Sequence, residues 1–176
     1  MNKAGGARTN LSGKNFEKET DNENFLLKNN FIKKNFWIEK EYNDKKIIFL
    51  SQGSFKKYIK EKFDIEIFRN PDEAYIIVFK TGKIDIKILE KKKQNVHGSV
   101  ETKLWASPSL KREYELVLEN FTVEYALCLS NYFKEKINSS IKKYKILQKI
   151  LDENSIEIFY GSDLDYFEKL HKWIHQ

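Results

Sequence analysis

The sequence predicts an α/β protein in which helices flank a central mixed β-sheet. Two β-rich runs, 74–79 and 84–89, stand on either side of a short turn that contains glycine, which is typical of a β-hairpin. Apolar stretches of helix and strand length then alternate along the rest of the chain. This order favours helices packed on a mixed sheet over a helix bundle or a barrel.

Two helices are expected before the hairpin. Apolar residues at helical spacing predict one at about 12–29 and a second at 55–63. The apolar run at 47–50 lies before the second helix. It is not counted as a strand in the expected order of elements. Residues 1–10 are expected to form a mobile arm.

After the hairpin, helices and strands are expected in turn. They are a helix at about 108–117, a strand at about 121–129, a long helix at about 131–153, a strand at 156–160 and a helix at about 163–175. We find no internal repeat and no linker rich in Pro, Gly or Ser. We therefore expect residues 1–176 to form a single domain.

Charge points to a polyanionic partner. The 176 residues carry a formal net charge of +6, and 40% of them are hydrophobic, enough for a real core. The cations are mostly lysine, which predicts phosphate contacts rather than bidentate reading of bases. Nucleic acid therefore leads the candidate partners. A bias in the base composition of the coding genome explains the lysine content equally well.

Cysteine content and hydropathy indicate the cellular compartment that we expect for the protein. Cys128 lies in an apolar run, where a buried thiol is ordinary, and one cysteine allows neither an intrachain disulfide nor a cysteine-based zinc site. The N-terminus lacks the apolar stretch of a signal peptide, and no run reaches the roughly 20 apolar residues of a membrane span. We expect a cytoplasmic protein without membrane contact.

Three polar residues near the open end of the hairpin are expected to meet. Asp72 precedes the first strand, and Glu90 and Lys92 stand near the end of the second. With a two-residue turn at 81–82, position 72 faces position 91. Glu90 and Lys92 flank that position and project from one face of the strand. The three side chains can therefore share one small site.

Two carboxylates beside a lysine suit metal-assisted hydrolysis of a phosphodiester. The oxygens of Asp72 and Glu90 are ligands that Mg²⁺ prefers. Lys92 can hold or deprotonate the attacking water and offset the charge of the transition state. Segment 85–87 also has an acid-x-lysine form, but in this register Asp85 faces position 78, about 20 Å from Asp72. We expect Asp85 and Lys87 to form the polar face of a half-covered strand.

The spacing Pro71-Asp72, then residues 73–89, then Glu90-Lys91-Lys92 resembles the PD-(D/E)xK signature of type II restriction endonucleases. The segment 94–104 is similar to the passage of these enzymes from the catalytic strand through a Gly-Ser turn into a helix. Residues 5–20 resemble their opening helix. The resemblance covers roughly residues 5–120 of a chain that is short for such an enzyme. Base contacts would then come from loops, a partner subunit or a dimer mate.

The resemblance implies a restriction-endonuclease-like fold whose hairpin carries the active site. Asp72, Glu90 and Lys92 would be catalytic, with Mg²⁺ held by the two acids, and Glu17 and Gln94 would be accessory. It further implies sequence-specific cleavage of double-stranded DNA by a homodimer, with a companion DNA methyltransferase. The residues expected to contact DNA are Lys93, His97, Ser99, Lys103 and Arg112.

Two other functions fit the same residues. A structure-specific nuclease, such as a Holliday-junction resolvase or a repair nicking enzyme, would use the same three groups and suits the small size. A non-catalytic basic DNA-binding module would leave the carboxylates as surface charge. His171 and His175, one helical turn apart, lack a third ligand nearby in the sequence and are expected on a solvated helix face.

Overall fold

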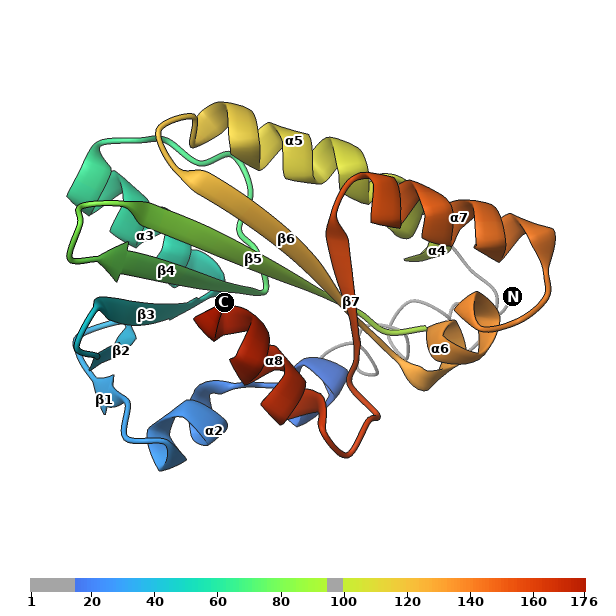
Figure 1. Ribbon diagram of the computed structural model, residues 1–176, viewed down its shortest axis with the longest axis horizontal. Coiled ribbons are helices and arrows are strands. Elements are labelled where there is room, and N and C mark those ends of the chain that lie inside the picture. Colours follow the sequence, from blue (N-terminus) through green and yellow to red (C-terminus); the bar gives the residue numbers. More distant parts are fainter. Residues whose placement is uncertain (1–14, 95–99) are drawn as a thin grey trace, which may run out of the picture.

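The computed structural model describes residues 15–94 and 100–176. These residues form a seven-stranded mixed sheet flanked by helices, and the order of strands in the sheet follows the chain (Figure 1). The expected mobile arm at 1–10 lies outside the described residues. The strands are β1 (Ile32–Lys33), β2 (Ile38–Glu41), β3 (Lys45–Ser51), β4 (Glu73–Phe79), β5 (Ile84–Lys92), β6 (Thr122–Leu129) and β7 (Ile156–Tyr160).

The type of strand pairing changes once across the sheet. β1 to β5 form an antiparallel meander, whereas β5, β6 and β7 run parallel and are joined by helices. Residues 15–19 are also helical. The labelled helices are α2 (Glu23–Lys28), α3 (Gln52–Phe63), α4 (Val100–Trp105), α5 (Ser107–Val117), α6 (Asn131–Ile137), α7 (Lys142–Glu153) and α8 (Tyr166–His175).

Helices cover both faces of the sheet. One face packs against α3, α5 and α7 through residues such as Phe55, Tyr114 and Leu147. The other packs against α2 and α8 through Leu26 and Trp173, and Figure 1 shows α5 and α7 on the opposite side of the sheet from α8. Strands covered on both faces read as continuous apolar runs. No helix within the described ranges is long and apolar enough to cross a membrane.

Two expected helices are interrupted. The helix expected at 131–153 is α6 followed by α7, because the Ser139 hydroxyl donates to the carbonyl of Lys136 at 2.6 Å and accepts from the amide of Ile141 at 3.3 Å. Such local side-chain bonds compete with the helix. The helix expected at 12–29 is likewise broken before α2, where the amide of Asn22 donates to the carboxylate of Glu73 instead.

The sheet is larger than expected, because β1, β2 and β3 precede the hairpin. β3 carries the apolar run 47–50 and pairs with β4 along its whole length, from Lys45 with Phe79 to Ser51 with Glu73. In β2 the charged segment 39–41 hides the alternation by which a strand is recognised. The other expected helices and strands correspond to α3, β4, β5, α5, β6, β7 and α8, with shifted ends.

The β4–β5 hairpin is confirmed, but its register differs by one residue from the expected one. Its loop is residues 80–82: the amide of Gly82 donates to the carbonyl of Phe79, and the amide of Phe79 donates to the carbonyl of Lys83, both at 2.9 Å. Gly82 has a φ of 88°, as in a three-residue loop that ends in a bulge. Glu73 therefore pairs with Leu89, and continuing this register places position 72 beside position 90 rather than 91.

Candidate active site

Asp72, Glu90 and Lys92 lie together at the open end of the hairpin, as expected. The Nζ of Lys92 is 2.6 Å from Oε2 of Glu90 and 3.6 Å from Oδ2 of Asp72. The observed register brings them together, because position 72 continues β4 directly beside Glu90 and therefore shares its face of the sheet. The site forms where β4 begins and β5 ends.

Two backbone amides hold Asp72, one through its carboxylate and one through its main-chain carbonyl. The amide of Lys91 donates to Oδ2 of Asp72 at 2.6 Å, and the amide of Gln52, where β3 turns into α3, donates to the Asp72 carbonyl at 3.2 Å. Pro71, which precedes Asp72, is buried. The carboxylate is therefore anchored by the sheet and does not hang from a free loop.

Burial shapes the electrostatics of the site. The side chains of Asp72, Glu90 and Lys92 are only 20%, 14% and 16% exposed. Burial raises the pKa of Glu90, with Lys92 opposing this shift and Asp72 adding to it. Burial alone would lower the pKa of Lys92, but the two carboxylates outweigh it and the pKa is raised. Lys92 is thus a charged ammonium ion that donates hydrogen bonds.

Asp85 lies far from this site, as expected, but the face it shares with Lys87 is not half-covered. Asp85 pairs with Ile77, five residues along β4 from Asp72 and so about 17 Å away. The expectation of a polar face is wrong, because α8 covers it and Lys87 is 1% exposed. Its Nζ donates to Glu124 at 2.8 Å and to the carbonyl of Trp173 at 2.9 Å.

A buried ion pair between Lys91 and Glu73 lies on the face of the hairpin opposite to the candidate site. The Nζ of Lys91 lies 2.6 Å from Oε1 of Glu73, and the two side chains are 3% and 2% exposed. Lys91 also donates to the carbonyl of Thr20 at 2.9 Å, and Tyr75 donates to Glu73 at 2.6 Å. Burial raises the pKa of Glu73, against the charge of Lys91. Lys91 is therefore a structural residue and not a free surface charge, contrary to what its position beside the motif suggests.

A cleft of about 360 Å³ opens beside Asp72 on this side. Glu17, the accessory acid suggested by the family resemblance, lies in its wall together with Asp21, and its carbonyl accepts from Lys91 at 3.4 Å. Ser51 and Gln52 line the cleft as well. Glu17 and Asp72 therefore lie on the wall of one cleft.

The other residues expected at the site are scattered around it. Gln94 is buried just after β5, and its backbone exchanges hydrogen bonds with the Ser130 hydroxyl at 3.2 and 3.0 Å. Lys93 places its Nζ 5.8 Å from the centre of the Phe16 ring. Lys103 is exposed on α4, and its charge acts on Glu90.

Arg112, Ser99 and His97 give no further support for a base-reading surface. Arg112 lies exposed on α5 and pairs within that helix with Glu115 at 3.0 Å. His97 and Ser99 lie outside the described residues. The expectation of a solvated face for the C-terminal histidines is wrong for both residues. The ring of His175 is partly buried edge-on against Tyr42, and burial lowers its pKa to about 4; the ring of His171 is partly buried edge-on against Phe25.

Three residues near the site are not predicted as site residues from the sequence. The Nε of Arg69 donates to both carboxylate oxygens of Glu113 in α5, at 3.0 and 2.9 Å, and the charge of Glu90 acts on the Arg69 guanidinium. Tyr114 and Tyr125 are buried on the same face as Glu90. Arg69 stands two residues before Pro71-Asp72, the one signal that could have drawn attention to it; the tyrosines look like ordinary core residues.

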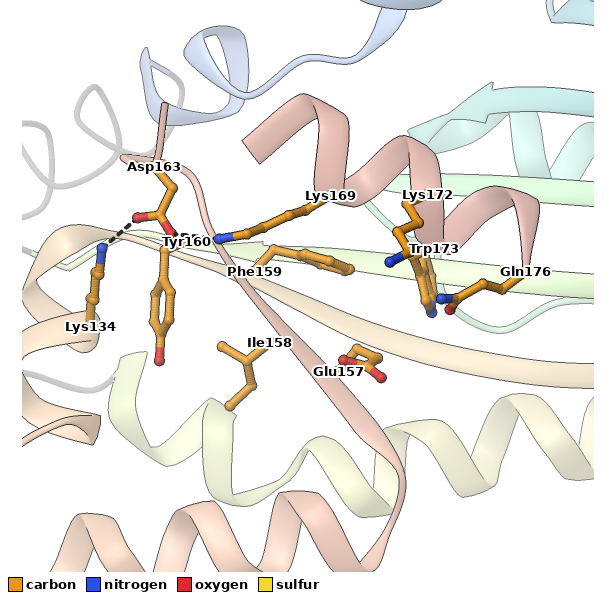
Figure 2. A pocket seen from close by; sticks show the side chains of 10 residues that line it. All are labelled: Lys134, Glu157, Ile158, Phe159, Tyr160, Asp163, Lys169, Lys172, Trp173 and Gln176. Atoms are coloured by element: carbon orange, nitrogen blue, oxygen red, sulfur yellow. Dashed lines mark hydrogen bonds and ion pairs between the residues drawn. The ribbon is translucent and has the colours of Figure 1, made fainter. Parts of the chain in front are cut away.

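A second cavity, of about 380 Å³, lies between β7 and α8 (Figure 2). Its acid, Asp163, is 2.6 Å from the Nζ of Lys134 and 3.5 Å from that of Lys169. Burial alone would raise the pKa of Asp163, but these two lysines lower it overall. Asp163 is thus paired with two of the lysines that line this cavity.

The donor set at Asp72 and Glu90 fits magnesium. Hydrogen bonds from described residues reach only Oδ2 of Asp72 and Oε2 of Glu90, which leaves the other oxygen of each acid for a ligand. Mg²⁺ is commonly held by one or two carboxylates plus substrate phosphate and water. Within 15–94 and 100–176, no group of three or more His, Cys, Asp or Glu side chains is arranged to hold a metal ion.

Comparisons with protein-family models, with curated proteins and with solved structures give no match for this chain. The case for a function therefore comes from the chain's own residues.

Proposed function

We propose that this protein is a Mg²⁺-dependent endonuclease that cleaves double-stranded DNA at specific sequences, in the manner of type II restriction enzymes. One observation carries the proposal: Lys92, 2.6 Å from Glu90 and 3.6 Å from Asp72, brings two acids and a lysine together in a partly buried site. Burying charges is costly unless they serve one another or a ligand. Structural ion pairs also do this, so the free carboxylate oxygens are what point to chemistry.

Each residue has a role in this proposal. Asp72 and Glu90 would hold Mg²⁺ through the oxygens that Lys92 and the Lys91 amide leave free. The ion, when bound, supplies Lewis acidity and a water of lowered pKa. Lys92 donates to the attacking water or to the scissile phosphate and offsets the charge that develops there. Glu17, in the adjoining cleft, would assist Asp72.

The connection of the strands agrees with a restriction-endonuclease-like fold. The hairpin β4–β5 bears the three residues, helices α4 and α5 follow, and β6 returns parallel to β5. This is the arrangement that the resemblance implies for the catalytic part of such enzymes. A homodimer acting on a symmetric site, and a companion methyltransferase that protects host DNA, belong to the same proposal.

The structure-specific nuclease remains the second candidate, because it would use the same three groups. The non-catalytic binding module is weaker: Glu90 and Lys92 are too buried for ordinary surface charge. The deciding experiment incubates the protein and Mg²⁺ with unmethylated plasmid and, separately, with a synthetic four-way junction. Discrete plasmid fragments that disappear in the Asp72→Asn variant support restriction, and cutting of the junction alone supports a resolvase. Binding without cutting of either substrate would overturn both nuclease proposals.

A further inference from the structure

Two buried tyrosines near the candidate site have hydroxyls that lack a partner. Tyr114 of α5 is 3% exposed and Tyr125 of β6 is 1% exposed, and neither hydroxyl has a hydrogen-bond partner among the described residues. A buried hydroxyl without a partner has given up its bonds to water and gained none, which destabilises the fold. Native proteins hold few such groups.

Tyr125 lies on the same face of the sheet as Glu90, and Tyr114 packs against Tyr125. Tyr125 pairs with Ile88 in β5, and Glu90 is the next residue on that face of the strand. The ring of Tyr114 lies 6.3 Å from that of Tyr125, centre to centre. Burial raises the pKa of both phenols, and the charge of Glu90 is the next largest cause. Neither phenol is hydrogen-bonded to Glu90 in this structure, so the acid or the rings must shift before such a bond forms.

A third tyrosine of the same core cluster provides the contrast. Tyr144 of α7 is 4% exposed, and its hydroxyl donates to Oε2 of Glu101 at 3.0 Å. The hydroxyl of Tyr144 is thus satisfied within the fold, whereas those of Tyr114 and Tyr125 have no such partner among the described residues.

We propose that Tyr114 and Tyr125 are positioning residues that orient the Glu90 carboxylate during the cleavage reaction. The inference rests on the proposed function, and it assigns the two hydroxyls a partner in the reacting complex. Oε2 of Glu90 is held by Lys92 at 2.6 Å in this structure. A carboxylate that binds a metal through one oxygen is oriented by donors to its remaining lone pairs, and loss of such donors weakens metal binding or activity about 10- to 100-fold.

The test compares Tyr114→Phe and Tyr125→Phe with Tyr144→Phe as a matched control. The first two variants should resist urea as well as the wild type or better, because each loses an unpaired hydroxyl. Their single-turnover cleavage at saturating enzyme should fall about 10- to 100-fold, and their affinity for Ca²⁺, measured calorimetrically without DNA, should fall too. Tyr144→Phe should show the reverse: lower resistance to urea and an unchanged cleavage rate.

The outcomes separate this inference from the proposed function. Wild-type cleavage rates and Ca²⁺ affinities in Tyr114→Phe and Tyr125→Phe would overturn the positioning role and leave the nuclease proposal intact. A loss of urea resistance equal to that of Tyr144→Phe would do the same. If the wild type cleaves no DNA, the nuclease proposal fails and the Ca²⁺ titration decides. Weaker Ca²⁺ binding by Tyr114→Phe or Tyr125→Phe would still support the role at Glu90, and unchanged or absent binding would end it.

Discussion

The amide of Lys91 donates a 2.6 Å hydrogen bond to Oδ2 of Asp72, so the backbone of one hairpin strand fixes the acid that opens the other. A backbone donor cannot be removed by changing a side chain. The Lys91 amide can also donate to a replacement side chain that keeps an oxygen where Oδ2 of Asp72 lies. Asparagine does so, which makes it possible to remove the charge of Asp72 and keep its geometry.

Asp72→Asn should therefore fold normally and lose cleavage. We expect a free energy of unfolding within about 1 kcal/mol of the wild type, since the bond from Lys91 survives. The rate of Mg²⁺-dependent cleavage should fall by at least about 10²-fold, because a charged ligand is lost. DNA affinity should change little, since phosphate contacts come from the basic surface. Retained activity in a gel assay of plasmid cleavage would show that Asp72 binds no metal.

Lys92 and Lys93 should behave differently although they are neighbours. Lys92→Ala should lower the single-turnover rate by at least about 10²-fold, as for a lost positioned acid-base group. Lys93, which lies over the Phe16 ring and not at the acids, serves as the control, and Lys93→Ala should cleave at nearly the wild-type rate. Saturating enzyme removes affinity from the comparison. Equal rates for the two variants would reduce Lys92 to a phosphate contact.

Lys91 should matter for stability instead. Lys91→Met leaves Glu73 buried and unpaired, and breaking a buried ion pair in this way typically costs about 3–5 kcal/mol. The double change Lys91→Met with Glu73→Leu should recover much of that loss, because two apolar groups replace the pair. Urea denaturation gives the free energies, with Lys93→Met expected within about 0.5 kcal/mol of the wild type. A double variant no more stable than Lys91→Met would argue that Glu73 has another role.

Acid should destabilise the fold through His175. Its pKa is lowered from 6.5 to about 4 by burial and then by the nearby charges of His171, Lys45 and Lys40. The unfolded chain therefore binds a proton before the native protein does. This contribution to stability is complete above pH 6.5 and is lost as the pH falls towards 4. His175→Gln should lose less stability over that window in urea titrations. Parallel losses in the two proteins would mean that His175 is not held neutral by the fold.

The composition of the site could be predicted from the sequence because it depends on local facts. Asp72 stands at the start of one strand, and Glu90 and Lys92 are two apart on the next, so alternation alone puts the latter pair on one face. The register could not be fixed in the same way. It depends on whether Gly82 takes a positive φ as the third residue of a loop, and both two- and three-residue loops suit this sequence.

Burial by elements that are distant in the chain could not be predicted from the sequence either. Lys87 and Asp85 look like the polar side of a strand until α8, eighty residues later, covers them and Trp173 accepts a hydrogen bond from Lys87. The same holds for Tyr114 and Tyr125, whose spacing marks core positions but says nothing of whether their hydroxyls find partners. Nonlocal contacts decide both points.

The loop at 80–82 gives the hairpin an unusual sensitivity to chain length. Successive residues of β5 belong to different faces, so a one-residue deletion in the loop that slid β5 by one position would offer Lys91 and Lys93 to Asp72 in place of Glu90 and Lys92. The loop lies about 25 Å along the strands from that acid and contributes no side chain to it. Residues 80 and 81 can vary, but Gly82, with its positive φ, and the length of the loop cannot change without a compensating bulge. The length of this three-residue loop, at the far tip of the hairpin, thus decides which residues of β5 lie beside Asp72 in the candidate site.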